Sequence, residues 1–384
     1  MNVAEMDNEN KKAEIGRSTA PNETRELTNI DVSIILREIT GRLIANQARL
    51  DQFYQLDDSH FVFRFKTKEG KKDLVFNPPR FVFLRDSEKA EGQMNPFVSV
   101  LKNSFLNRIL KSASQIRDDR IISLEFEGGS VILELMRKGN AIVVKDGKIA
   151  ALDENEKIKE RPLELNGEYS PPPSQKKEAK KQNVIESLKG GEKLVVAITR
   201  NVAVPALYVN ELLEELGFDP KSDPSAMKQQ EAELIGERIE EFASNVKEGK
   251  AQIVIFKSKY LAADKKLAER IACKEECKTF GSLSEVLSSL YASEAFGQIK
   301  KTREKKIVKL MSRLEHQEAR AKQAEAEIDE EKRKGEWIIS NMEKVNQLVQ
   351  EYKNIKASND KSALEGFLKK NKAAIIKNGI QLDV

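Results

Sequence analysis

The sequence is poor in cysteine, histidine and tryptophan, and these shortages limit the classes of protein that it can encode. Two cysteines, two histidines and one tryptophan occur in 384 residues. Two cysteines cannot form the dense disulfide framework of a small secreted domain, so the composition favours a reducing, cytoplasmic environment. Cys273 and Cys277 share a helical pattern, but two thiolates without nearby histidines do not complete a tetrahedral zinc site. We therefore expect no metal and no other cofactor.

Long hydrophobic runs are also missing, and neither sign of charge dominates. No stretch approaches the ~20 apolar residues that a transmembrane helix needs, so we expect no membrane association. Residues 1–26 lack the apolar block of a signal peptide, and we interpret them as a disordered extension. The 66 basic and 62 acidic side chains leave a formal net charge of +4. Nucleic-acid binding therefore has to be argued from local clusters of charge.

What the sequence does contain predicts an α+β fold. Hydrophobic residues make up 39% of the chain and charged residues 33%, which suggests compact domains together with a long solvated helix. Residues 27–165 predict one domain: a capped helix over residues 28–45, a strand at residues 61–65 and a second helix over residues 96–112. Short apolar runs joined by glycine turns follow, and they predict a β-meander.

The rest of the chain divides into a linker, a middle domain and an arm. Three prolines and a lysine-rich stretch mark residues 166–183 as a linker. Residues 184–298 predict a helical middle domain, with a short strand at residues 253–256. Residues 299–356 predict a coiled-coil arm, whose weak heptad seam needs a partner helix. Residues 357–384 predict a short helix and a strand at the tip of this arm.

The segment from Gln115 to Ile149 contains a glutamine, Asp-Arg, a strand, Glu-Leu and Gly-Asn in this order, at Gln115, Asp119, Arg120, Glu134, Gly139 and Asn140. This pattern resembles the N-terminal domain of the NFACT family of ribosome quality-control factors. Further similarities, in the family's order, are Asp31, Glu38, Arg161, Gly167, Tyr169, the stretch Phe280–Glu285 and Lys334–Glu336. Over residues 27–356 the chain is identified as an archaeal-type member that lacks the family's C-terminal NFACT-R domain.

The resemblance implies both an architecture and a role. It implies an N-terminal domain related to that of formamidopyrimidine-DNA glycosylases, a middle domain like helix-hairpin-helix modules and a long coiled-coil helix. It also implies a cytoplasmic RNA-binding factor of ribosome-associated quality control. Such a factor binds tRNA and the rRNA and proteins of the obstructed large ribosomal subunit, and supports C-terminal tailing of stalled nascent chains. Self-association through the coiled coil is a further expectation.

Three residues are tied to tRNA handling by the resemblance: Asp31, Asp119 and Arg120. An arginine fork can bind a phosphate or stack on a base, and a neighbouring aspartate can orient it. From the residues alone, Asp119 and Arg120 also fit a solvated turn with a weak surface ion pair. Asp31 also fits a helix N-terminal acid that the helix dipole favours.

A basic cluster at the start of the predicted arm is a second candidate for RNA binding. Candidate contacts to the RNA backbone are Lys300, Lys301, Arg303, Lys305 and Lys306. Like charges at this density can follow a phosphate backbone. They fit the solvated face of a coiled coil equally well.

No catalytic constellation is visible, so we do not expect an enzyme. The first predicted helix lacks the N-terminal proline with which glycosylases attack, and Gly190–Gly191 is not followed by a P-loop lysine at the required spacing. One alternative is a glycosylase-like nucleic-acid-binding protein without catalysis. Another is an adhesion protein, because bacterial relatives carry the name fibronectin-binding protein A. The absence of an export signal argues against adhesion.

Overall fold

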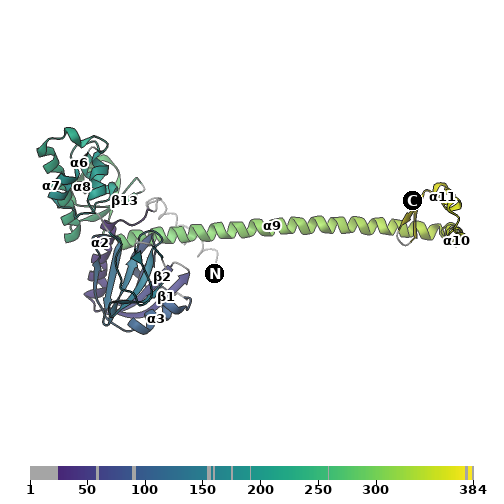
Figure 1. Cartoon of the computed structure of the whole chain (residues 1–384), viewed down its shortest axis with the longest axis horizontal. Helices are drawn as coiled ribbons and strands as arrows, with labels where there is room; N and C mark the ends of the chain where they lie inside the picture. Colours follow the sequence, from purple (N-terminus) through teal and green to yellow (C-terminus); the bar gives the residue numbers. More distant parts are fainter. Residues whose placement is uncertain are drawn as a thin grey trace, which may run out of the picture. The chain divides into compact units, whose positions relative to one another are not determined.

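The computed structural model describes residues 25–57, 60–88, 92–153, 157–158, 161–173, 176–190, 192–257, 259–376 and 379–382. They fall into two compact units, with the first ending at Phe296 and the second beginning at Gly297 (Figure 1). The first unit contains the N-terminal and middle domains. Nearly all of the extension predicted for residues 1–26 lies outside the described residues.

The N-terminal domain contains two antiparallel sheets, each with its strands in sequence order. Helix α2 (Asn29–Ile39) continues into η1 (Thr40–Ile44) and precedes the first sheet, and α3 (Pro96–Phe105) follows it. The four-stranded sheet comprises β1 (Arg49–Asp57), β2 (His60–Thr67), β3 (Gly70–Asn77) and β4 (Phe81–Asp86). The five-stranded sheet comprises β5 (Leu110–Gln115), β6 (Ile121–Phe126), β7 (Gly129–Glu134), β8 (Asn140–Lys145) and β9 (Lys148–Leu152). The small pair β10 (Lys157–Ile158) and β11 (Arg161–Pro162) completes the domain.

The predicted meander is present, but two of the details were wrong. The helix predicted over residues 96–112 ends at Phe105, and its last residues belong to β5 instead. Asn107 adopts a left-handed conformation with φ of 63°, which directs the chain out of the helix. Strand β1 was missed because a register shift between Leu50 and Gln52 breaks the period of two on which strand prediction depends.

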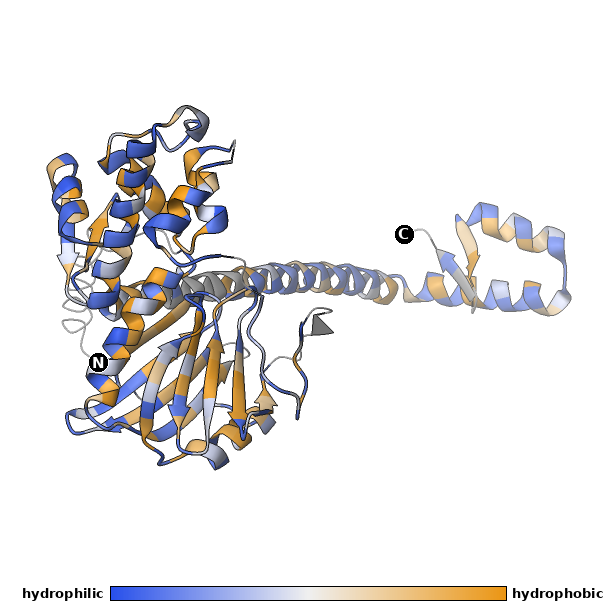
Figure 2. Cartoon of the chain, turned by 60° about the vertical axis from the view of Figure 1, so that its left-hand side comes forward, coloured by the Kyte–Doolittle hydropathy of each residue, from blue (hydrophilic) through white to orange (hydrophobic). Residues whose placement is uncertain are grey.

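The two sheets share an apolar core rich in phenylalanine. The rings of Phe65 and Phe126, one from each sheet, stack with centroids 6.4 Å apart, and Phe105 of α3 stacks on Phe126 at 4.8 Å. Figure 2 shows hydrophobic residues concentrated along these strands. Full burial of one such side chain stabilises a fold by about 2–3 kcal/mol, so these contacts hold the sheets and α3 as one body.

The middle domain combines helices with a small antiparallel sheet. Its helices are α4 (Lys181–Ser187), α5 (Leu194–Asn201), α6 (Ala206–Glu215), η2 (Pro224–Ala226), α7 (Gln229–Glu248) and α8 (Lys265–Lys274). The sheet has the order β13-β12-β14, formed by β12 (Gln252–Phe256), β13 (Lys259–Ala263) and β14 (Cys277–Phe280). The prediction of a helical domain was therefore incomplete, because β13 reads as a continuous apolar run and β14 has only four residues.

A long helix, α9 (Leu283–Ser340), leads from the first unit into the second. It begins well before residue 299, where the arm was predicted to start. The second unit also holds α10 (Met342–Ser358), α11 (Lys361–Lys370) and a hairpin of β15 (Ala373–Ile376) and β16 (Gly379–Leu382). Within the described parts of the chain, no helix combines the length and hydrophobicity required to span a bilayer.

Candidate nucleic-acid interface

The candidate interface starts at the N-terminus of α2, which is fixed by a capping box. The Asp31 backbone N–H donates to the Thr28 hydroxyl at 3.2 Å, and the Thr28 backbone N–H donates to the Asp31 carboxylate at 2.6 Å. The two side chains thus satisfy N–H groups that the helix itself leaves unpaired. The capped helix start that the sequence predicted at residue 28 is confirmed here.

Asp31 itself is completely buried. Its carboxylate accepts hydrogen bonds from Arg25 at 2.5 and 3.0 Å, from the Thr28 hydroxyl at 2.8 Å and from the Tyr208 hydroxyl at 3.4 Å. The Asp31 side chain is 0% exposed, against 25% for Arg25. Asp31 therefore acts here as a helix cap and as the partner of Arg25. A direct contact between Asp31 and tRNA stays a prediction.

Two tyrosines of the middle domain enclose this buried pair. The Arg25 guanidinium lies 4.2 Å from the ring centre of Tyr260, and the Tyr208 hydroxyl accepts from the Ala262 backbone N–H at 3.3 Å. Burial, reinforced by the negative charge of Asp31, raises the pKa of both tyrosines well above the usual value. Both phenols therefore stay protonated, and Tyr208 remains a donor that ties the middle domain to α2.

Asp119 and Arg120 lie in the tight turn between β5 and β6. Arg117 and Asp118 adopt left-handed conformations with φ of 55° and 49°, and the Asp119 backbone N–H donates to the Ile116 carbonyl at 3.0 Å. The Asp119 carboxylate then accepts from the Arg120 backbone N–H at 2.8 Å. The aspartate thus fixes the backbone of the arginine rather than its guanidinium.

The Arg120 guanidinium is only lightly held. It donates to the Glu26 carboxylate at 2.6 Å and to the Leu27 carbonyl at 3.4 Å. The side chains of Arg120 and Glu26 are 25% and 55% exposed. Exposed ion pairs of this kind contribute about 0.2–1 kcal/mol, so a phosphate can replace the Glu26 carboxylate at small cost.

Gln115 joins this turn to α2. Its amide nitrogen donates to the Asn29 and Asp119 carbonyls, both at 2.8 Å, and its amide oxygen accepts from the Ser33 hydroxyl at 2.7 Å. All of these bonds cross between β5, the turn and the first helix. Gln115 was part of the family pattern, and the structure places it as the residue that positions the turn against α2.

A pocket of about 600 Å3 opens beside these residues, between the two domains of the first unit. It is lined by Glu26, Leu27, Thr28, Asn29, Asp118, Asp119, Arg120, Pro173, Lys176, Arg200, Ala203, Val204 and Pro205. Of the three residues tied to tRNA handling, Asp119 and Arg120 line the pocket and Asp31 does not. We call this the Arg120 pocket.

Sequence reasoning missed the contribution of the middle domain to the Arg120 pocket. Arg200, at the end of α5, carried no signal in the sequence. Lys176 belongs to the lysine-rich stretch that predicted a linker. Both cations reach the pocket only because the middle domain packs against α2, where the Asn29 side chain donates to the Ala203 carbonyl at 2.8 Å. A contact between residues this distant in the chain leaves no local pattern to detect.

Other residues of the family pattern are structural. The buried Glu134 carboxylate accepts from Arg161, at 3.2 Å for one nitrogen, and from the Tyr169 hydroxyl at 2.8 Å. Gly139 has φ of +78°, and an added Cβ would lie 2.0 Å from the Pro78 Cβ, so only glycine fits there. These residues shape the domain and do not line the Arg120 pocket.

Glu38 fixes the start of the long helix α9. Its carboxylate accepts from the backbone N–H groups of Leu283 at 2.7 Å and Ser284 at 3.2 Å. A carboxylate at this position satisfies unpaired donors and complements the helix dipole. The family-like residue Glu38 therefore ties α2 to the base of α9.

The basic cluster predicted on the arm is only partly described. Residues 300–306 are helical within α9, but of the five candidates only Lys306 has a described side chain, and it is exposed. The side chains of Lys300, Lys301, Arg303 and Lys305 lie outside the described residues. Their contact with RNA stays a prediction.

The described residues contain no group of three or more His, Cys, Asp or Glu side chains arranged to hold a metal ion. Cys273 is exposed and Cys277 is half-buried, and both are free thiols.

The chain was compared with known protein families and proteins. The family model described as NFACT N-terminal and middle domains matches residues 28–383. The archaeal Rqc2 homolog aRqcH of Methanocaldococcus jannaschii is 22% identical over 379 residues, covering 90% of this chain and 55% of that protein. Ribosome quality control complex subunit 2 of Schizosaccharomyces pombe is 22% identical over 125 residues, covering 30% of this chain and 12% of that protein. The chain thus spans about half the length of the archaeal relative.

Two solved structures share the fold. The N-terminal part of the fibronectin/fibrinogen-binding protein from Streptococcus suis has a TM-score of 0.53 at 16% identity, covering 69% of this chain and 98% of that one. The fibrinogen-binding protein from Staphylococcus aureus has a TM-score of 0.52 at 17% identity, with the same coverage. At these identities the likeness concerns the mixed α/β architecture alone.

Proposed function

The chain belongs to the NFACT family, and we propose that it binds tRNA and the obstructed large ribosomal subunit as a factor of ribosome-associated quality control. The names of the yeast and archaeal relatives support a role in ribosome quality control. The observation that carries the tRNA part of the proposal is the Arg120 pocket, where the partly exposed Arg120 guanidinium shares the lining with two further cations, Lys176 and Arg200.

In the proposed complex, a tRNA phosphate takes the position of the Glu26 carboxylate on Arg120. Arginine binds phosphate through two parallel N–H donors, which a lysine at the same position would not provide. Asp119 keeps the turn in shape through the Arg120 backbone N–H, and Gln115 holds that turn against α2. The buried pair of Asp31 and Arg25 supports the proposed site by fixing the start of α2.

The proposed role is placement of tRNA and not catalysis by the chain itself. The ribosome supplies the chemistry of peptide-bond formation, so a factor that holds a charged tRNA in place is sufficient for tailing of the nascent chain. In the same proposal, the heptad face of α9 pairs with a second helix, and the basic residues near Lys306 follow rRNA. We also propose that the N-terminal domain shares its fold with the N-terminal domain of formamidopyrimidine-DNA glycosylases.

Binding of labelled tRNA to the full chain, measured by fluorescence anisotropy over a salt titration, tests the Arg120 pocket. Arg120→Ala should weaken binding at least tenfold, equivalent to about 1.4 kcal/mol. It should also reduce the slope of log affinity against log salt by about one, which corresponds to the loss of one phosphate contact. The matched control is Arg108→Ala, because Arg108 is an exposed arginine of the same domain that pairs with Glu127 at 3.5 Å, outside the pocket. Equal affinity and equal slope for both variants would refute the assignment of tRNA to this pocket.

A further inference from the structure

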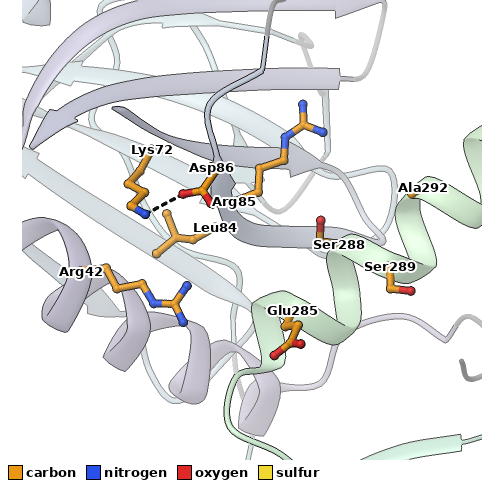
Figure 3. Close-up of a pocket in the computed structure, with 9 residues that line it drawn as sticks. All are labelled: Arg42, Lys72, Leu84, Arg85, Asp86, Glu285, Ser288, Ser289 and Ala292. Carbon is orange, nitrogen blue, oxygen red and sulfur yellow. Dashed lines mark hydrogen bonds and ion pairs between the residues drawn. The ribbon is translucent and has the colours of Figure 1, made fainter. Parts of the chain in front are cut away.

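A second pocket, of about 520 Å3, lies between η1, the end of β4 and the start of α9 (Figure 3). Its residue Arg42 stands at the other end of the first helical segment from Asn29 of the Arg120 pocket. It is lined by Arg42, Lys72, Leu84, Arg85, Asp86, Glu285, Ser288, Ser289 and Ala292. Asn29 of the Arg120 pocket and Arg42 of this one are separated along α2 and η1 by a helical length of about 20 Å. The two pockets share no lining residue. We call this second one the Arg42 pocket.

Arg42 is the residue of this pocket whose presence is not explained by any bond of its side chain to the described residues. Figure 3 shows its side chain extending from η1 toward α9. Throughout the described part of the chain its guanidinium has no hydrogen bond and no ion pair. An arginine fork offers five N–H donors, so Arg42 is available to a ligand.

The opposite wall of the pocket carries an acidic side chain, Asp86, that pairs with Lys72. The Lys72 ammonium lies 2.6 Å from the Asp86 carboxylate, and the side chain of Asp86 is 87% exposed. The hydrogen bond from Lys72, together with the charges of Lys72 and Arg42, holds the pKa of Asp86 below its usual value. Asp86 thus marks a position in the field of two cations, and its exposed ion pair is weak enough to be displaced by another oxyanion.

Helix α9 contributes groups of a different kind. Glu285 and Ser288 are one helical turn apart and line the same pocket. Neither the Glu285 carboxylate nor the Ser288 hydroxyl has a partner among the described residues. Because a carboxylate only accepts hydrogen bonds, a ligand that fits here must present hydroxyl or amino groups to Glu285. A free phosphate would leave that carboxylate unused and would be repelled by it.

We propose that the Arg42 pocket binds one ribonucleotide of an RNA strand, with its phosphate between Arg42 and Lys72 and its 2′-hydroxyl donating to Glu285. A ribonucleotide presents an oxyanion and neutral donors side by side, as this arrangement of charges requires. An acidic peptide presents carboxylates without the neighbouring sugar hydroxyl that can donate to Glu285. Arg85 takes no part, because it pairs with Glu88 at 2.8 Å and is directed away from Arg42 in Figure 3.

The inference rests on the proposed function in that its ligand is RNA, but it concerns a separate site. Both pockets lie in the first unit and are connected by one continuous helical segment. A strand or folded RNA that reaches both pockets would gain affinity from the second contact without any conformational change.

The test uses the full chain, a short labelled oligoribonucleotide and the deoxyribonucleotide of the same sequence. Arg42→Ala should weaken binding of the RNA about tenfold and lower the salt slope by about one. Asp86→Asn should have the opposite effect and strengthen binding, because it removes the competing anion. Glu285→Ala should abolish most of the preference for RNA over DNA, because it removes the acceptor for the 2′-hydroxyl. Arg108→Ala is the matched control and should bind as the unaltered chain does.

The outcomes separate the two sites. Loss of affinity in Arg120→Ala with none in Arg42→Ala would overturn the Arg42 pocket and leave the proposed function standing, whereas the reverse would overturn the Arg120 pocket alone. Binding of neither nucleic acid by the unaltered chain would overturn both. Adenosine monophosphate or inorganic phosphate that competes at a lower concentration than the oligonucleotide would identify a free ligand, against the RNA proposal. Arg42 is exposed, so unchanged thermal unfolding should confirm that each variant folds.

Discussion

Apolar residues have different surroundings in the N-terminal sheets and along α9. Phe65, Phe105 and Phe126 are buried in one core that joins both sheets. Along α9 the heptad residues are exposed, with Leu314 at 55% and Ile328 at 58%. Figure 2 shows that hydrophobic residues are frequent in the strands, whereas hydrophilic residues dominate the described part of α9. Burial therefore stabilises the N-terminal sheets, whereas the exposed apolar residues of α9 gain no stability from burial within their own helix.

Truncation of a core side chain should give the largest loss in the free energy of unfolding. A small loss would contradict the contrast between the sheets and α9. Phe126→Ala removes a ring that contacts both Phe65 and Phe105, and it should destabilise the protein by about 3–5 kcal/mol. Ile328→Ala on α9 should cost less than about 0.5 kcal/mol, because the side chain is already in water. Urea unfolding followed by circular dichroism compares the two variants directly. Similar costs would mean that the arm is buried in solution.

Replacement of the buried Asp31 at the start of α2 should give the second-largest loss of stability. Asp31→Asn leaves Arg25 without its counter-charge, and we expect a loss of about 2–3 kcal/mol, reduced from the fully buried case because Arg25 is partly exposed. The control Asp118→Asn removes an acid that pairs with Lys247 at the surface, and it should cost under about 1 kcal/mol. Any loss of tRNA binding in Asp31→Asn should follow its loss of folded protein. Weakened binding at full stability would instead favour direct contact between Asp31 and RNA.

The smallest expected effect concerns the pH dependence of Asp86. Its folded-state pKa lies below the ordinary value of 3.8, because Lys72 donates a hydrogen bond to the ionised form. The stabilisation by this pair is therefore present above pH 3.8 and disappears as the pH falls through the folded pKa. Asp86→Asn should be slightly less stable than the unaltered chain at neutral pH and equally stable in acid. A difference that grows in acid would contradict the sign.

The sequence predicted those features that depend on neighbouring residues. The helix start at Thr28 and the meander of β6 to β9 follow from local capping and turn patterns. It did not predict β1, whose bulge breaks the alternation, or β13 and β14, whose short apolar runs are ambiguous. Tertiary pairing decides such segments, and pairing partners are not visible in one sequence.

The candidate interface was predictable to a similar degree. Asp119 and Arg120 were found through the family pattern, and they do line one pocket. Arg200 and Arg42 were not found, because each lines a pocket formed by segments that are distant in the sequence. The burial of Asp31 was also not visible, since an acid in the first turn of a helix fits both a cap and a ligand contact.

The most direct test of the central claim is sequencing of RNA crosslinked to this protein in cells. A tRNA- and ribosome-binding factor of the NFACT family should enrich tRNA and large-subunit rRNA over messenger RNA. The same enrichment should decrease for Arg120→Ala and persist for Arg108→Ala. Recovery of neither tRNA nor large-subunit rRNA above background would contradict the account.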